Sequence, residues 1–182
     1  GSRGFGFWVA LPTAPTGLSV GAPAKPRATP LREFSNNVAH SNRNTGLNVD
    51  NGPKLDGTTE TAHYAPRQVP GDNSSPIVTA VFRNFIGYKS AGRAVWLRGT
   101  SLRLESPILA DNHIGATFAS SETFIQDGLL IGQTANSPTP FSRNFPVRGY
   151  EFYDGRVGAD RITFVNYQPT ANNYMSALGY NR

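Results

Sequence analysis

The chain has 182 residues, a net charge of +5 and 38% hydrophobic residues, which is enough for one domain with its own core. It contains no cysteine, which excludes disulfides and thiolate metal sites, and no apolar run of about 18 residues that could span a membrane. No heptad or sustained helical periodicity occurs, which excludes a helix bundle. The 19 Gly, 14 Pro and 15 Asn, set between short β-branched and aromatic runs, indicate an all-β protein rich in turns.

The basic residues are 14 Arg and only 3 Lys, and they are scattered singly along the chain. No basic run and no nucleic-acid-binding module is present, so we expect no nucleic-acid partner. Arginine suits planar, bidentate recognition of carboxylate, sulfate or phosphate groups. A polyanionic glycan would also be attracted by this positive field.

One short strand pattern, a small residue followed by alternating side chains, recurs along the chain. Its copies begin at positions 6, 46, 94, 115, 149 and, more weakly, 176. Between residues 80 and 120 a longer pattern is written twice, with an offset of 22 residues from Ile86 to Ile108 and of 21 from Leu97 to Phe118. Self-similarity at a short fixed period is typical of a solenoid, whose coils bury their apolar faces against one another. The sequence thus predicts about six stacked coils.

Three stretches between the coils are predicted to be loop insertions within a single domain over residues 1–182. They are the Pro-rich residues 12–30, the polar residues 52–76 and the Pro-containing residues 132–148. The chain starts without Met, inside what is predicted to be the last strand of a coil. We therefore expect a slice of a longer or processed protein.

A series of short motifs, spread in order over nearly the whole chain, is similar to one known family. The motifs include Gly6-Phe7-Trp8-Val9-Ala10-Leu11-Pro12, Asn37-Val38-Ala39-His40-Ser41-Asn42, Val95-Trp96-Leu97-Arg98-Gly99, Ala110-Asp111-Asn112, Asn144-Phe145-Pro146-Val147-Arg148-Gly149 and Tyr153-Asp154-Gly155. Together they resemble the β-helix region of the cell migration-inducing hyaluronan-binding protein and transmembrane cell-surface hyaluronidase family, which are G8-domain proteins. The resemblance implies an all-β, right-handed parallel β-helix, located outside the cell or at its surface.

Candidate carboxylates follow several of the aligned strands. Hydrolysis of a glycosidic bond usually needs two carboxyl groups, about 5 to 9.5 Å apart. Asp50, Asp111 and Asp154 each follow a predicted strand, so stacked coils can bring such groups to one side. Asp-Asn and Asp-Gly pairs are also common turn formers, and this structural role is the alternative.

Lyase chemistry on a uronic acid polymer needs a base and a group that neutralises the carboxylate. His40 and Tyr88 align on adjacent coils, with Lys89 and Asp111 beside the same column. The alternative is that His40 and Tyr88 are ordinary, partly buried side chains.

Trp96 and Arg98 form the sharpest single motif. If Val95 and Leu97 face the core, Trp96 and Arg98 lie together on the outer face, where they suit a sugar ring and its carboxylate. If the strand is turned the other way, Trp96 belongs to the core and Arg98 to a solvated edge. Alternation alone leaves both assignments open.

The three histidines share no metal-ligand spacing, so we expect no metal site and no cofactor, with calcium held by Asp and Asn oxygens in stacked turns as the alternative. We predict a module that binds an anionic polysaccharide; whether it also cleaves it, as a hyaluronidase-like glycosidase or a polysaccharide lyase, stays open. The catalytic candidates are Asp111, His40 and Asp154, and the substrate-binding candidates are Trp96, Arg98, Tyr88, Lys89 and Arg148. The rival hypothesis is a non-catalytic adhesive module that joins flanking domains or a second copy by end-to-end stacking of open coils.

Overall fold

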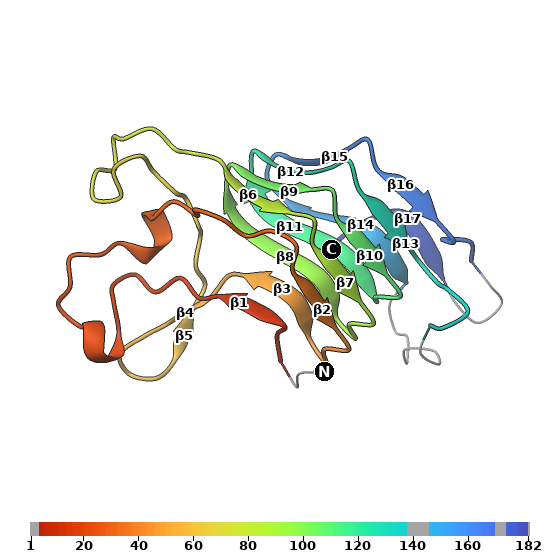
Figure 1. The fold of residues 1–182 in the computed structure, drawn as a ribbon, viewed down its shortest axis with the longest axis horizontal. Coiled ribbons are helices and arrows are strands. Elements are labelled where there is room, and N and C mark those ends of the chain that lie inside the picture. The colour runs from red at the N-terminus through yellow and green to blue at the C-terminus, as the bar shows by residue number, and fades with distance from the viewer. Residues whose placement is uncertain (1–3, 138–145, 170–173, 182) are drawn as a thin grey trace.

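A computed structural model describes residues 4–137, 146–169 and 174–181, and in them the chain winds through three parallel sheets (Figure 1). Sheet A contains β1 (Phe7–Val9), β3 (Thr45–Val49), β8 (Arg93–Thr100), β11 (Ile114–Ser121), β14 (Val147–Asp154) and β17 (Met175–Tyr180). Sheet B contains β6 (Ala80–Arg83), β9 (Leu102–Glu105), β12 (Thr123–Gln126) and β15 (Val157–Asp160). Sheet C contains β2 (Val38–His40), β7 (Ile86–Tyr88), β10 (Ile108–Ala110), β13 (Leu129–Ile131) and β16 (Thr163–Val165).

Each full coil passes from sheet B to sheet C and then to sheet A, as in β6, β7 and β8 followed by β9, β10 and β11. All pairings within these three sheets are parallel, and Figure 1 shows successive coils lying side by side. The six strands of sheet A correspond to six coils. The predicted parallel β-helix of about six coils is therefore confirmed.

The predicted repeat offsets appear as strand register. Ile86 is paired with Ile108, and Leu97 is paired with Phe118. The earlier match between residues 34–39 and 82–87 also becomes a pairing, since Val38 lies opposite Ile86. Residues that are 21, 22 or 48 positions apart in the chain thus become neighbours on adjacent coils.

The interior is filled by apolar side chains from strands of all three sheets. Val95, Leu97 and Phe118 are fully buried, and the aromatic ring of Phe118 packs edge-on against that of Tyr150, with ring centres 5.3 Å apart. In β8 this places Trp96 and Arg98 on the outer face, so the structure selects the first of the two assignments left open by the alternation. The described residues contain no helix long and apolar enough to cross a membrane.

The small residue that opens each strand of sheet A is explained by a close approach between coils. A Cβ atom added to Gly115 would lie 2.3 Å from the carbonyl oxygen of Gly149 on the next coil. Such a contact is far below the normal separation, so a larger residue would push the two coils apart.

Loop segments occupy much of two of the predicted insertions. Residues 12–30 contain only two short 3₁₀ turns, η1 (Gly17–Ser19) and η2 (Pro26–Ala28). Residues 52–76 contain the small antiparallel pair of β4 (Gly52–Pro53) and β5 (Thr59–Glu60). Of the third insertion, residues 138–145 lie outside the described part.

The corners between sheets are made by single residues with left-handed backbone. They are Asn36, Asn84, Ser106, Asp127 and Arg161 between sheets B and C, and Ser41, Lys89, Asp111 and Asn166 between sheets C and A. Between sheets A and B the corner residues are Ser101, Glu122 and Gly155. A non-glycine residue pays a conformational penalty at such a position, which Asn and Asp tolerate best.

Replacing Lys89 with glycine is expected to stabilise the fold. Lys89 has a φ of 56°, and glycine removes the steric penalty of about 1–2 kcal/mol while adding about 0.5–1 kcal/mol of unfolded-state entropy. The expected net gain is about 0.5–1 kcal/mol in urea unfolding. Lys25, with a φ of −123°, is the matched control, and its replacement by glycine should give no gain. Equal effects at both positions would contradict the backbone explanation.

Candidate functional site

The outer face of sheet A carries one continuous line of polar and aromatic side chains. We call Trp8, Asn48, Trp96, Thr117 and Glu151 the outer row, because parallel pairing sets them directly side by side. Adjacent strands lie about 4.8 Å apart, so the row crosses five coils. Trp8 and Trp96 keep exposed surface, whereas Asn48, Thr117 and Glu151 are buried beneath their neighbours. The buried side chains of the same strands fix this orientation.

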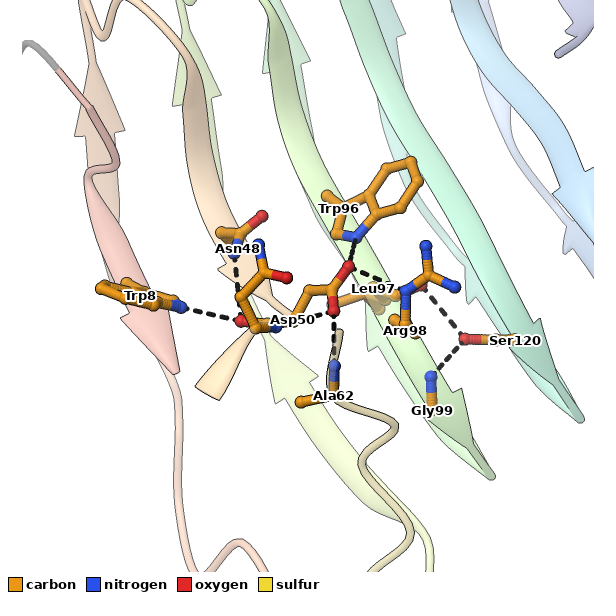
Figure 2. Close-up of polar contacts among 10 residues, drawn as sticks. Trp8, Asn48, Asp50, Ala62, Trp96, Leu97, Arg98, Gly99 and Ser120 are labelled. Carbon is orange, nitrogen blue, oxygen red and sulfur yellow. Dashed lines mark hydrogen bonds and ion pairs between the residues drawn. The ribbon is translucent and has the colours of Figure 1, made fainter. Parts of the chain in front are cut away.

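Asp50 directly follows β3 and holds the centre of the row together (Figure 2). Its Oδ2 accepts hydrogen bonds from Trp96 Nε1 at 2.9 Å and from Arg98 Nε at 2.8 Å. Its Oδ1 accepts from the backbone N–H groups of Asn51 at 2.7 Å and Ala62 at 3.1 Å. The carboxylate therefore joins β3, β8 and the insertion 52–76.

The electrostatics of Asp50 favour its charged form. Burial acts to raise the pKa of this carboxyl, but hydrogen bonds from Arg98, the two backbone N–H groups and Trp96 outweigh burial and leave the pKa below its ordinary value. A carboxylate held this way is a poor proton donor at neutral pH. Its evident role is to orient Trp96 and Arg98.

Trp96 lies between two guanidinium groups. The Cζ of Arg93 is 5.0 Å from the centre of the indole ring and the Cζ of Arg98 is 5.3 Å from it, both within cation–π range. Tyr153 packs edge-on against the same indole, with ring centres 5.4 Å apart, and is itself 43% exposed. Aromatic surface and positive charge thus meet at one place on the outer row.

His63 stands at the end of this cluster, where insertion 52–76 returns to sheet A. Its Nε2 lies 2.6 Å from Thr100 Oγ1. Burial, followed by the positive charge of Arg98, lowers the pKa of His63, and Asp50 opposes this shift. The imidazole is therefore neutral at physiological pH.

A second charged cluster lies on the row at Glu151. Glu151 Oε2 accepts from Thr117 Oγ1 at 2.8 Å and from Arg93 Nη2 at 3.0 Å, and Oε1 accepts from Arg148 Nη1. Arg93 Nε donates to Thr117 Oγ1 at 2.7 Å, which closes the network. The Glu151 side chain is only 2% exposed, so it is a buried carboxylate compensated by two arginines.

This cluster forms one wall of a pocket of about 550 Å³, which we call the Arg93 pocket. Its lining residues are Gly92, Arg93, His113, Ile114, Pro146, Arg148, Glu151 and Asn181. Its volume falls within the range of about 300–1,000 Å³ usual for small-ligand sites.

The predicted site residues divide between two sheets. Trp96, Arg98 and Arg148 lie on sheet A, in or beside the clusters just described. His40 and Tyr88 lie on sheet C, where their rings stack with centres 4.9 Å apart, and Lys89 follows Tyr88 at a corner. His40 and Tyr88, aligned in the sequence, are therefore neighbours in the structure. They lie on sheet C, whereas the outer row lies on sheet A.

The three catalytic candidates do not form one constellation. Asp111 is a corner residue that follows β10, and its carboxylate accepts two hydrogen bonds from Thr134, at 2.7 and 2.8 Å. His40 ends β2, which lies two strands from β10 in sheet C, or about 10 Å away. Asp154 is exposed at the far end of β14 in sheet A. In the described residues no group of three or more His, Asp or Glu side chains is placed to hold a metal.

Sequence reasoning missed Arg93, Thr117 and Glu151 as site residues. The signal was present for Glu151, because the aligned strand copies put it in line with Trp96. Its partners were hidden, since Arg93 is 58 residues away and Thr117 is 34 residues away in the sequence.

Six parallel coils around an apolar core, with aromatic and polar side chains along the outer face of one sheet, define a parallel β-helix protein. The family model described as the CEMIP beta-helix matches residues 1–47. The chain is 34% identical, over 99% of its length, to the cell migration-inducing and hyaluronan-binding protein of Mus musculus. It is 33% identical over 99% of its length to the cell surface hyaluronidase CEMIP2 of Homo sapiens, and 27% identical over 99% to a cell surface hyaluronidase of Danio rerio.

The similarity to the β-helix region of the CEMIP family, predicted from the sequence motifs, is confirmed. It spans about a sixth of the length of these relatives, 15–16% of each.

Proposed function

We propose that the outer row of sheet A binds an anionic polysaccharide of the hyaluronan type, outside the cell or at its surface. The observation that carries the proposal is the setting of Trp96, an indole flanked by Arg93 and Arg98 and anchored by Asp50. An aromatic ring offers a flat apolar surface to a sugar, and the guanidiniums offer charge to its carboxylate. The names of the relatives, a hyaluronan-binding protein and hyaluronidases, support this ligand class.

Binding is better supported than cleavage on this face. Cleavage needs a carboxyl group that can give up or take a proton in contact with the substrate. Asp50 accepts four hydrogen bonds through its carboxylate, and Glu151 accepts three, two of them from arginines. Both carboxylates are thus engaged in holding other side chains.

Tyr153→Ala tests the proposal without removing a core residue. Tyr153 is an exposed neighbour of the Trp96 indole, so its loss should weaken binding of a hyaluronan oligosaccharide by about tenfold, or about 1.4 kcal/mol. Isothermal titration calorimetry at constant salt measures the change. Tyr88→Ala on sheet C is the matched control and should leave the affinity unchanged. If Tyr88→Ala weakens binding and Tyr153→Ala does not, the ligand binds to sheet C and the proposal is wrong.

Catalysis by Asp111, His40 and Asp154 stays a separate prediction. Reducing-end release from hyaluronan by the protein, compared with its Asp111→Asn and His40→Ala variants, measures it. The adhesive alternative also stays a prediction, and light scattering over a range of concentrations measures self-association.

A further inference from the structure

Among the residues that the structure describes, the lining of the Arg93 pocket contains two guanidinium groups and one carboxylate. The side chains of Arg93 and Arg148 are 28% and 19% exposed, whereas that of Glu151 is 2% exposed. Arginine stays protonated in proteins, so the two guanidiniums carry two positive charges, of which the Glu151 side chain can compensate at most one. A ligand with one negative charge would balance the other.

The two guanidiniums retain hydrogen-bonding capacity toward the pocket. Each has five N–H groups. Arg93 uses Nε for Thr117 and Nη2 for Glu151, and Arg148 uses Nη1 for Glu151. The remaining N–H groups take no part in these bonds, and both side chains line the pocket.

The positions of the guanidiniums are fixed by their surroundings. Glu151 is held by Thr117 as well as by the two arginines, so it anchors both of them. Gly179 makes room for Arg148, because a Cβ at this position would lie 2.5 Å from Arg148 Cδ and 2.7 Å from its Nε. A site arranged before the ligand arrives loses less entropy on binding.

We propose that the Arg93 pocket is the subsite for the carboxylate of one uronate unit of the polysaccharide. Arg93 and Arg148 bind the carboxylate, and Glu151 is the positioning residue that orients them. This inference rests on the proposed function, because Arg93 also stacks on Trp96 and so places the next sugar against the outer row. A sulfate ester has the same charge and suits the same arginines, so the experiment must separate the two anions.

The test compares two ligands on two proteins by isothermal titration calorimetry. The ligands are a hyaluronan oligosaccharide of defined length and the same oligosaccharide with its carboxyl groups reduced to alcohols. For the unmodified protein, reduction should weaken binding by about tenfold or more, which matches the loss of one charge-assisted contact. In Arg148→Gln the penalty for reducing the ligand should fall below about threefold, since one charge-assisted contact is gone.

Arg83→Gln is the matched control. Arg83 also pairs with a glutamate, Glu105 at 2.9 Å, but it lies on β6 of sheet B and is 56% exposed. This variant should keep the full penalty. If Arg148→Gln is not folded by circular dichroism, Arg148→Lys replaces it, and the penalty should again shrink because lysine lacks the planar fork.

Each contrary result has a distinct meaning. If Arg148→Gln keeps the penalty of the unmodified protein, or if the unmodified protein shows no penalty, the pocket is not a carboxylate subsite, while the proposed function stands. If the unmodified protein binds neither ligand, the proposed function itself fails. A preference for sulfated over unsulfated chondroitin that disappears in Arg148→Gln would overturn the inference by assigning the pocket to sulfate.

Discussion

Asp50→Ala is expected to lower the free energy of unfolding by about 3 kcal/mol, because it leaves a partly buried arginine and three N–H donors without their acceptor. The four hydrogen bonds come from the Trp96 and Arg98 side chains and from the backbone at residues 51 and 62. The substitution therefore removes hydrogen bonds from β8 as well as from the insertion 52–76. Urea unfolding at neutral pH, followed by circular dichroism, measures it.

Asp154→Ala is the matched control for this prediction. Asp154 also ends a strand of sheet A, but its side chain is exposed, so the change should stay within about 0.5 kcal/mol. Equal losses at the two positions would mean that the hydrogen bonds of Asp50 add nothing to stability.

The Asp50 carboxylate should also make the free energy of unfolding depend on pH in the acidic range. The pKa of Asp50 is lowered from an ordinary value of 3.8 in the folded chain, so the unfolded chain takes up its proton first as the pH falls. The contribution is present above pH 3.8 and is lost as the pH falls through the folded pKa. Asp50→Ala should therefore show a shallower decline in stability below pH 3.8 than the unmodified protein.

Phe118→Ala is expected to be the most destabilising truncation, at about 3–5 kcal/mol. Phe118 is fully buried in the middle of the coil stack, where its ring packs edge-on against Tyr150. Alanine leaves a cavity between two adjacent coils that the fixed register cannot close. Thermal and urea unfolding both measure the loss.

Phe124→Ala provides the comparison for Phe118. Phe124 lies on β12 with an outward-facing ring, which is covered by the guanidinium of Arg103 at 4.7 Å. Its truncation leaves no closed cavity, so the cost should be below about 1.5 kcal/mol. A cost for Phe124 as large as that for Phe118 would show that burial between coils is not the source of the effect.

Much of the fold could be predicted because each coil repeats the same local requirements. Ile86 and Ile108 fill equivalent places in adjacent strands, so the same residue type recurs at a fixed offset. Whether Trp96 faces the core or the outer surface could not be predicted, because a strict alternation of side chains fits either orientation of the strand. Only the complete burial of Val95 and Leu97 decides it.

The candidate site was less accessible to sequence reasoning. His40 and Tyr88 were correctly expected on adjacent coils, but nothing in their sequence separation reveals that they belong to sheet C. The place of Asp111 directly after a strand suited a catalytic carboxylate. Its left-handed backbone, with a φ of 57°, is that of a corner residue. Long-range contacts such as Arg93 with Glu151 arise only when three coils are stacked.

The connection from β3 of sheet A to β6 of sheet B shows how this architecture accommodates extra chain. Residues 52–76 follow β3, Tyr64 forms a parallel bridge with Gly99 of β8, and Asn48 still lies opposite Trp96. The register of the stacked strands is therefore kept beside a long insertion. Connections of this kind are suitable attachment points for grafted peptides or reporter segments, and natural variation in recognition can accumulate there while the framework stays the same.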